Sequence, residues 1–381
     1  MKILYVIDKM QNYAGIERII SCKMNYISKQ TIHNVLLTTY DQQFKDLPFQ
    51  LNEEISYHPI YVPMPLRNKT SFYSWLKAYI LARSHFKTQF RSLLNKNQPD
   101  IVICTVYSFQ VLDIIIELCY KKGIKTIMES HTKGETVTMA HKFKYNRHLY
   151  KLALLWDQRI MKSLRHCSCV VTLTKKDVPF WQRYAKRIEV IPNMLTITPK
   201  KVLDYGSKRV ISAGRYMSEK GFDRLLEAWY HIDSKFHDWQ LYIFGNGDRH
   251  VYQAIVEKYE MNDRVHLMPA TTDIAEEFSK SSLYVMSSRY EGFGLVLAEA
   301  MSCGLPSVSF DCPYGPREII NDGEDGLLAE DGNIEDLAKK LEQLMSDEEL
   351  RIKMGTKAIQ NIARFKPEVI MTQWINLFNN I

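Results

Sequence analysis

The stretch Glu291-Gly-Phe-Gly-Leu-Val-Leu-Ala-Glu299 holds two carboxylates with seven residues between them. It follows an apolar run at 283–286 and continues into the apolar segment 295–301. This order predicts a strand, a turn at 292–294 and the start of a helix. The first amides of a helix have no partner inside it, so they can bind an anion. At roughly 1.5 Å rise per residue, Glu299 would lie in the second helical turn, where it can accept hydrogen bonds from a ribose.

A second pattern that suits an anion is Ser212-Ala-Gly-Arg-Tyr-Met-Ser-Glu-Lys-Gly-Phe222. It predicts a turn from a strand to a helix, with Arg215 and Lys220 on the turn. A guanidinium can bind a diphosphate through two parallel hydrogen bonds, and an ammonium acts as a point charge. The alternative is a cluster of charges at a helix start with no ligand. The sequence contains no Asp-x-Asp triplet, which argues against a divalent cation held on the diphosphate.

Apolar, β-branched runs alternate with helical patterns along the whole chain, which predicts α/β domains with parallel sheets. A second series of strands begins after residues 188–193, so we expect two doubly wound domains with a linker at 192–207. Ligands of such domains bind outside the carboxyl ends of the strands. The expected strands are 3–7, 35–39, 101–105, 126–129 and 170–174 in the first series, and 209–213, 240–244, 265–268, 283–287 and 307–310 in the second.

The composition fits a globular protein of more than one domain, with 381 residues, 46% hydrophobic and 24% charged. Seven scattered cysteines argue against a disulfide framework and agree with a reducing compartment. No apolar run reaches the ~18 residues that a membrane span needs. The start, 1–8, is too short and too soon acidic for a secretory signal and predicts a first buried strand. We therefore expect a cytoplasmic protein.

The net charge of +7 is unevenly placed. Residues 66–99 contain seven Lys and Arg and no Asp or Glu, and residues 142–165 contain seven against the single Asp157. Both stretches interleave aromatic and aliphatic residues, a pattern typical of helices that lie on an anionic membrane surface. The alternative is an ordinary core helix with a basic, solvated face. No recognised nucleic-acid motif accompanies the charge, so we expect no nucleic-acid partner.

The fuller string from Ser288 to Pro306, followed by Phe310-Asp-Cys-Pro-Tyr-Gly-Pro-Arg-Glu-Ile-Ile320, resembles the retaining GT-B glycosyltransferases of group 4, the glycosyl transferases group 1 type. It looks like the bacterial members of this group, the capsule, exopolysaccharide and O-antigen sugar transferases. The resemblance implies two Rossmann-like domains facing across a cleft. Residues 1–192, with a terminal helix at 365–381, would bind the acceptor, and residues 193–364 would bind the nucleotide sugar.

The resemblance also implies the reaction. A hexose or N-acetylhexosamine would pass from a UDP-sugar, with retention and without a metal or cofactor, to a saccharide acceptor. The acceptor would be lipid-linked and would belong to cell-surface polysaccharide biosynthesis. The enzyme would be peripheral on the inner face of the cytoplasmic membrane.

Residue roles follow from the resemblance position by position. Glu291 would hold sugar hydroxyls, Arg215 and Lys220 would neutralise the diphosphate, and Glu299 would bind the ribose. The predicted donor-site residues are Gly15, Arg215, Lys220, Gly245, Asn246, Pro269, Glu291, Gly292, Phe293, Gly294, Leu295, Val296 and Glu299. The residues predicted to act in catalysis are His131, Glu291, Arg215 and Lys220.

Five of these positions rest on less specific patterns, namely Gly15, His131, Gly245, Asn246 and Pro269. Gly15 lies in a loop where the family commonly has two adjacent glycines, and Ala14 replaces the first. His131 follows a predicted strand, where the family places a histidine near the reactive carbon and the C6 hydroxyl of the sugar; a lone histidine can also be purely structural. The turn at 245–247 and Pro269 follow strands, and such turns need small residues with or without a ligand.

Two other functions are compatible with the fold. A nucleotide-sugar epimerase would need further acid and base residues that the sequence does not identify. A catalytically inert, membrane-associated scaffold would have no physical need for Arg215, Lys220, Glu291 and Glu299, because buried charges are costly without a ligand.

Overall fold

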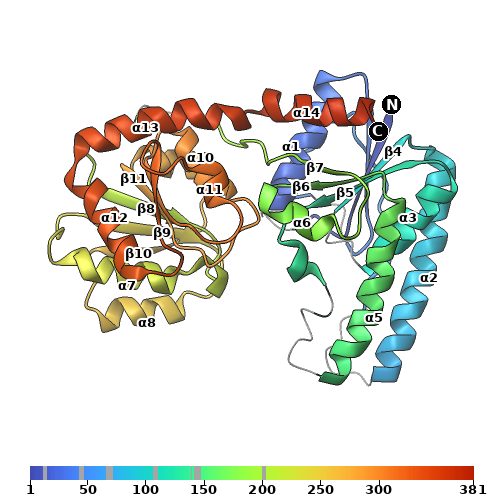
Figure 1. Ribbon diagram of the computed structural model, residues 1–381, viewed down its shortest axis with the longest axis horizontal. Coiled ribbons are helices and arrows are strands. Elements are labelled where there is room, and N and C mark those ends of the chain that lie inside the picture. The colour runs from blue at the N-terminus through green and yellow to red at the C-terminus, as the bar shows by residue number, and fades with distance from the viewer. Residues whose placement is uncertain are drawn as a thin grey trace. The chain divides into compact units, whose positions relative to one another are not determined.

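The computed structural model describes residues 1–381 except 12–14, 43–46, 66–71, 106–109, 139, 141–146 and 200–202. The chain divides into two compact units (Figure 1). Unit 1 comprises Met1–Pro192 and Ile370–Ile381, and unit 2 comprises Asn193–Val369. Each unit is built around one parallel sheet.

The sheet of unit 1 has the strand order β3-β2-β1-β4-β5-β6-β7, and all neighbouring strands are parallel. The chain reverses its direction of winding between β1 and β4, which is the point where doubly wound domains bind ligands. All five strands predicted for this part of the chain are present, whereas the short β3 and β7 were not predicted. The strands are β1 (Lys2–Ile7), β2 (Asn34–Thr39), β3 (Ser56–Tyr57), β4 (Ile101–Thr105), β5 (Lys125–Ser130), β6 (Cys169–Thr172) and β7 (Ile188–Val190).

Helices cover both faces of this sheet. Leu4 and Val6 of β1 share one buried cluster with apolar residues of α2, α3 and α5. On the other face, Glu129 of β5 contacts Lys23 of α1, whose ammonium lies 4.5 Å from the ring centroid of Trp374 in α14. The helices are α1 (Gly15–Gln30), α2 (Phe72–Asn97), α3 (Leu112–Lys121), α5 (Arg147–Ser163), α6 (Val178–Trp181) and α14 (Pro367–Asn379), which begins in unit 2.

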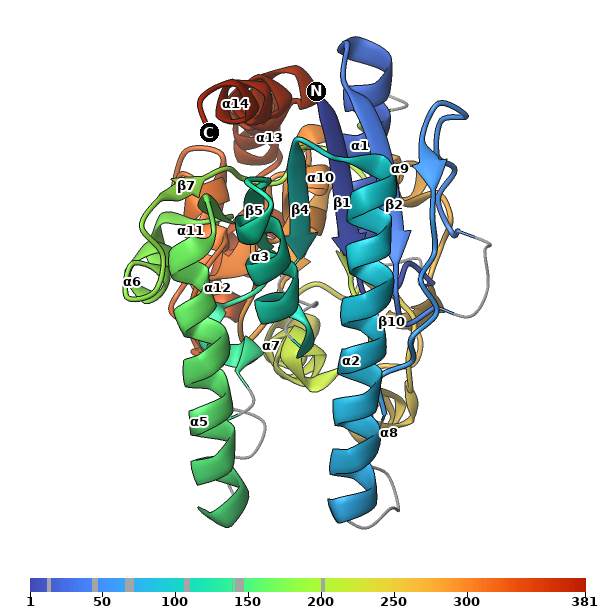
Figure 2. The same cartoon turned by 90° about the vertical axis from the view of Figure 1, so that its right-hand side faces the viewer.

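The N-terminal halves of α2 and α5 extend beyond the rest of unit 1 in the same direction (Figure 2). Side chains of the two helices meet where the rings of Tyr79 and Trp156 are 5.5 Å apart. Arg83 lies over the Trp156 ring and donates two hydrogen bonds to the buried carboxylate of Asp113 in α3. This contact fixes the bases of the two projecting segments.

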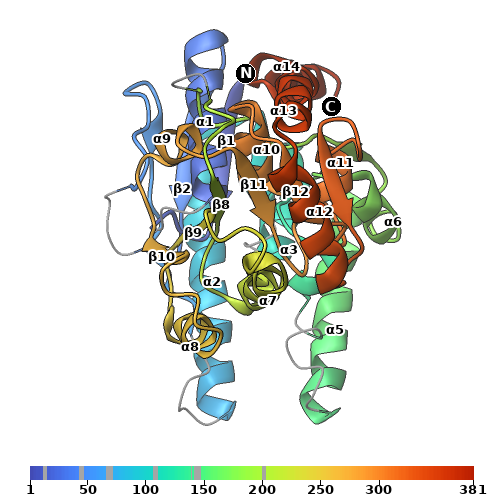
Figure 3. The ribbon, with the colours of Figure 1, turned by 90° about the vertical axis from the view of Figure 1, so that its left-hand side faces the viewer.

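The sheet of unit 2 has the order β10-β9-β8-β11-β12-β13, again parallel throughout (Figure 3). This order corresponds to 3-2-1-4-5-6, the Rossmann arrangement, with the switch between β8 and β11. The five predicted strands are present and β13 is additional. The strands are β8 (Arg209–Ala213), β9 (Gln240–Gly245), β10 (Val265–Pro269), β11 (Leu283–Met286), β12 (Ser307–Phe310) and β13 (Gly326–Ala329).

Apolar residues of α7, α8 and α12 pack on one face of this sheet and form the main core of unit 2. Helix α10 contacts β11 and carries the second glutamate of the motif. No helix in the described part of the chain is long and apolar enough to cross a bilayer. The helices are α7 (Phe222–Asp233), α8 (His250–Lys258), α9 (Ile274–Ser279), α10 (Leu295–Ser302), α11 (Pro316–Ile319), α12 (Ile334–Ser346) and α13 (Glu348–Ile362).

Candidate functional site

Two loops meet at the switch point of unit 2, one after β8 and one after β11. The backbone amide of Arg289 donates to the Glu219 carbonyl at 2.8 Å, and the Ser287 hydroxyl donates to the Lys220 carbonyl at 2.9 Å. Gly221 has φ +62°, and a Cβ there would lie 2.1 Å from the Ser287 carbonyl oxygen. Only glycine therefore permits this approach, which brings together two segments about 70 residues apart in sequence.

The charged side chains on these loops form one cluster. Lys220 Nζ donates to Glu291 Oε1 at 2.7 Å, and the Ser288 hydroxyl donates to the same oxygen at 2.6 Å. The Lys220 and Glu291 side chains are 25% and 11% exposed, so both can still be reached from solvent. The pair is neutral as a whole, and both members can bind a ligand: the ammonium can donate hydrogen bonds to an anion, and the carboxylate can accept them from hydroxyls.

Arg215 is exposed and lies on the loop after β8. Its charge acts on Tyr290 of the other loop: burial and the nearby Glu219 raise the pKa of Tyr290, and Arg215 opposes this rise. The neighbouring Tyr216 is buried, and its hydroxyl donates to the carbonyls of Ile243 at 2.6 Å and Met268 at 3.0 Å. The structure therefore brings Arg215 to the same pair of loops as Lys220 and Glu291.

The turn Gly292–Gly294 leads directly into α10. Gly294 precedes the helix with φ +97°, which favours glycine, and Phe293 is buried edge-on against Phe365 at 5.2 Å between ring centroids. Leu295 and Val296 are the first two residues of α10 and are half-buried. Their amides belong to the first turn, where no earlier carbonyl of the helix can accept from them. The predicted strand, turn and helix start are confirmed.

Glu299 is the fifth residue of α10 and is fully buried. The hydroxyl of Thr196 donates to its Oε1. The buried Tyr284 of β11 interacts electrostatically with both glutamates. Burial raises the pKa of its hydroxyl well above the usual range, and the charges of Glu291 and Glu299 raise this pKa further. The two carboxylates of the motif therefore act on one buried tyrosine. No sequence pattern indicated Thr196, which lies in the segment expected to be a linker.

The weaker unit 2 candidates lie at the carboxyl ends of β9 and β10. Gly245 ends β9, Asn246 follows it, and Pro269 ends β10. The Asn246 carbonyl accepts from the Tyr216 amide at 2.7 Å, which joins this turn to the loop after β8.

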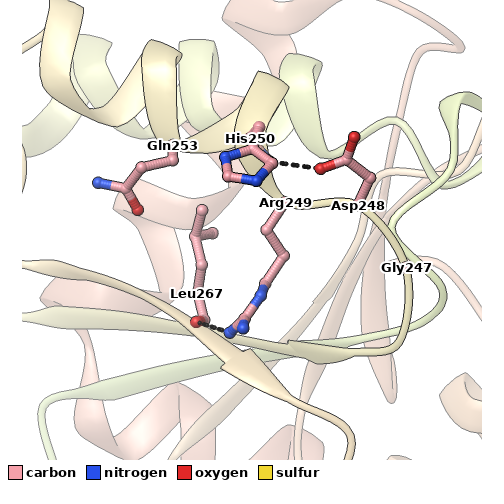
Figure 4. A pocket seen from close by; sticks show the side chains of 6 residues that line it. All are labelled: Gly247, Asp248, Arg249, His250, Gln253 and Leu267. Carbon is pink, nitrogen blue, oxygen red and sulfur yellow. Dashed lines mark hydrogen bonds between the residues drawn. The ribbon is translucent and has the colours of Figure 1, made fainter.

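A hollow of about 450 Å³ opens beside this turn, at Gly247 (Figure 4). On its wall, the guanidinium of Arg249 donates to the Leu267 carbonyl at 2.8 Å. The residues lining the hollow are Gly247, Asp248, Arg249, His250, Gln253 and Leu267, and they include none of the predicted site residues.

Unit 1 contains two predicted site residues. Gly15 is exposed as the first residue of α1, and Ala14 before it lies outside the described residues. His131 follows β5, but its ring is buried, with 1% of the side chain exposed. Its Nε2 lies 3.5 Å from Oε1 of Glu129, which also accepts from the ammonium of Lys23. Lys23 and Glu129 were not predicted, although a lysine on the apolar face of one helix and a glutamate inside an apolar strand were visible in the sequence.

Residues 194–361 match the family described as Glycosyl transferases group 1. The chain is 34% identical over 212 residues to an uncharacterized glycosyltransferase of Haemophilus influenzae, and the match covers 55% of this chain and 60% of that protein. It is 26% identical to the amylovoran biosynthesis glycosyltransferase AmsD of Erwinia amylovora over 99% of both chains. The crystal structure of TarM superposes with a TM-score of 0.80 over 99% of this chain and 98% of that chain, at 17% identity.

Two parallel-sheet units with these strand orders form a GT-B fold, and the chain is a glycosyltransferase. Its part at 194–361 is similar to the glycosyl transferases group 1 family. Members of this family use nucleotide-sugar donors and saccharide acceptors.

Proposed function

We propose that this chain transfers a hexose or N-acetylhexosamine from a UDP-sugar to a saccharide acceptor, with retention of configuration and without a metal ion. The cluster of Lys220, Glu291 and Ser288 beside the start of α10 carries this proposal. Cations and helix amides at one place suit a diphosphate. The carboxylate 2.7 Å from the lysine suits the hydroxyls of the attached sugar.

Each donor-site residue then has one task. Arg215 and Lys220 neutralise the diphosphate together with the amides of Leu295 and Val296. Glu291 holds the sugar hydroxyls, with the amides of Gly292–Gly294 beside it. Glu299, fixed by Thr196, accepts hydrogen bonds from the ribose. We assign His131 and Gly15 of unit 1 to substrate binding, and Gly245, Asn246 and Pro269 of unit 2 to contacts with the nucleotide.

The product belongs to cell-surface polysaccharide. Support comes from AmsD, whose name assigns it to amylovoran biosynthesis and whose full length this chain matches. The chain spans 60% of the length of the Haemophilus influenzae relative, so that match supports the reaction class alone.

A calorimetric panel of UDP-, GDP- and ADP-sugars against the purified protein tests the donor. We expect one UDP-sugar to bind, and we expect its slow hydrolysis to release the α-anomer from an α-linked donor, as measured by NMR. Binding confined to GDP- or ADP-sugars would overturn the UDP assignment. Release of the β-anomer would overturn retention. Binding of none of them would overturn the proposed function.

We also propose that the acceptor is lipid-linked and that unit 1 docks on the anionic inner face of the cytoplasmic membrane through the projecting halves of α2 and α5. Exposed apolar residues occur there on both helices, namely Tyr73, Ile80 and Leu81 on α2 and Tyr150, Leu154 and Leu155 on α5. Lys77 and Lys151 are exposed among them. The one carboxylate in these two helices, Asp157, is buried.

Charge and apolar surface here complement an anionic bilayer, because apolar side chains insert between lipids while each nearby cation adds about 1 kcal/mol of attraction. The fuller basic stretches continue into residues 66–71 and 141–146, which lie outside the described residues.

Co-sedimentation with phosphatidylglycerol vesicles tests the docking surface. We expect binding at low salt, release at high salt, and at least tenfold weaker binding for the double variant Leu81→Asp, Leu155→Asp. Ile359→Asp is the matched control, because Ile359 is a 50% exposed apolar residue on a helix of unit 2. Equally weakened vesicle binding in the control, or no binding by the wild type, would contradict this docking surface. Either result would favour the alternative, ordinary helices with a basic, solvated face.

A further inference from the structure

A buried row of three ionisable side chains lies under α1 in unit 1. Lys23 of α1, Glu129 of β5 and His131 after β5 have side chains that are 3%, 1% and 1% exposed. Lys23 Nζ donates to Glu129 Oε1, and His131 Nε2 lies 3.5 Å from the same oxygen. One carboxylate oxygen therefore faces both a lysine and a histidine.

The surroundings make the carboxylate an anion. Burial alone would raise the pKa of Glu129, but Lys23 and His131 outweigh it and lower this pKa to about 2. Lys23 is also held from its other side, 4.5 Å from the Trp374 ring centroid of α14. The Glu129 oxygen next to the histidine is thus charged, fixed in place and able only to accept a hydrogen bond.

The imidazole has unused hydrogen-bonding capacity. Neither ring nitrogen of His131 has a hydrogen-bond partner among the described residues. A buried polar atom without a partner is costly, so such atoms persist where a water or ligand supplies the partner. Because Nε2 faces an acceptor, its hydrogen is best placed there, which leaves Nδ1 as the nitrogen for another group.

We propose that Lys23 and Glu129 are positioning residues for His131. Lys23 orients the Glu129 carboxylate, and the carboxylate holds the imidazole with hydrogen on Nε2, so that Nδ1 is the atom offered to a hydroxyl of the bound substrate. This use of Nδ1 rests on the proposed function. The orientation of the ring does not, so the two can be tested apart.

Nitrogen NMR of the full chain tests the orientation without any substrate. In the wild type we expect hydrogen on Nε2 of His131, with the signal assigned by its loss in His131→Gln. In Glu129→Gln the amide can also donate to Nε2, so the form with hydrogen on Nδ1 should appear. Lys23→Met should broaden or shift the same signal.

Asp113→Asn is the matched control. Arg83 and Asp113 form another buried ion pair in unit 1, with side chains 9% and 8% exposed. Breaking that pair should lower stability comparably and leave the His131 signal unchanged. A wild-type ring with hydrogen on Nδ1, or equal shifts in the control, would overturn the proposal.

Kinetic measurements test whether Nδ1 of His131 acts on the bound substrate. Glu129→Gln should lower kcat at least tenfold with less than a threefold change in the KM for the donor. In a His131→Gln background the same substitution should have almost no further effect, because the two residues act through one group. Independent, multiplicative losses would show a merely structural role and would overturn the proposal. If the wild type transfers no sugar, the proposed function fails, and the NMR result still decides the orientation.

Discussion

The Lys220 ammonium lies 2.7 Å from Oε1 of Glu291, and this contact joins the loop after β8 to the loop after β11. Both residues stand at the switch point of unit 2, where the carboxyl ends of the central strands leave room for a ligand. In this pairing each charge compensates the other before a donor arrives. A diphosphate would then compete for the lysine while the sugar takes up the carboxylate.

Glu291→Ala should abolish sugar transfer while leaving the affinity for free UDP within a few fold, because the carboxylate is assigned to the sugar and not to the nucleotide. Calorimetry with UDP and a transfer assay measure the two effects. Asp233→Asn is the control, since its pair with Arg264 has nearly the same exposure, 13% and 27%, as Glu291 and Lys220 at 11% and 25%. Equal losses of UDP binding and transfer in Glu291→Ala would contradict the assignment.

Glu299→Gln should weaken UDP binding roughly 10- to 100-fold, since a hydrogen bond to a charged group contributes about 1.5–3 kcal/mol. Glutamine keeps the size of this fully buried side chain. Pyrophosphate has no ribose, so its affinity should stay within twofold of the wild type. If pyrophosphate binding falls in parallel with UDP binding, Glu299 acts through the helix and not on the ribose.

Gly245→Ala and Gly214→Ala should separate stability from function. A Cβ on Gly245 would lie 1.8 Å from the Gly214 carbonyl oxygen, so the backbone must move, and we expect a loss of about 1–3 kcal/mol in the free energy of unfolding. The atoms nearest to a Cβ on Gly214 would belong to the Lys220 side chain, at 3.2 Å. Gly214→Ala should therefore weaken UDP binding several-fold at nearly unchanged Tm. Comparable Tm values for both variants would refute this distinction.

Activity should survive EDTA, because Arg215, Lys220 and the first amides of α10 are proposed to balance the diphosphate charge. The assay compares initial rates before and after chelation and dialysis. Loss of activity that magnesium restores would show that an ion takes this role.

The raised pKa of Asp8 predicts that the stability of the protein depends on pH. Asp8 follows β1, and burial raises the pKa of its carboxyl to about 6. The unfolded chain releases this proton near pH 4, so between about pH 4 and 6 the folded state binds more protons and stability falls as the pH rises. At pH 7.5 the cost is about 2–3 kcal/mol.

Asp8→Asn should remove this cost. Denaturant unfolding should find the variant more stable than the wild type at pH 7.5 and nearly equal to it at pH 4. A constant difference between the two proteins across this range would show that Asp8 does not titrate as described.

Much of the fold follows from local patterns. The alternation of apolar runs and helical segments predicted ten strands, and all ten are present because buried parallel strands need continuous apolar sequence. Short edge strands such as β3, with two residues, carry too little pattern to be recognised. The glycine-bearing turn and the start of α10 were predicted because Gly294 and the apolar run after it specify them locally.

Contacts between segments far apart in the chain could not be predicted from the sequence. Two hydrogen bonds join residues more than 100 positions apart, one from Thr196 to Glu299 and one from Lys23 to Glu129. In neither case do the two residues belong to one sequence motif. The sequence alone determined where helices and strands form and which kinds of side chain stand at their ends, since these depend on neighbouring residues. Only the tertiary structure decided that Lys23 and His131 face the same oxygen of Glu129 and that the His131 ring is buried. The reason is that the order of the strands in the sheet sets the distances between segments far apart in the sequence.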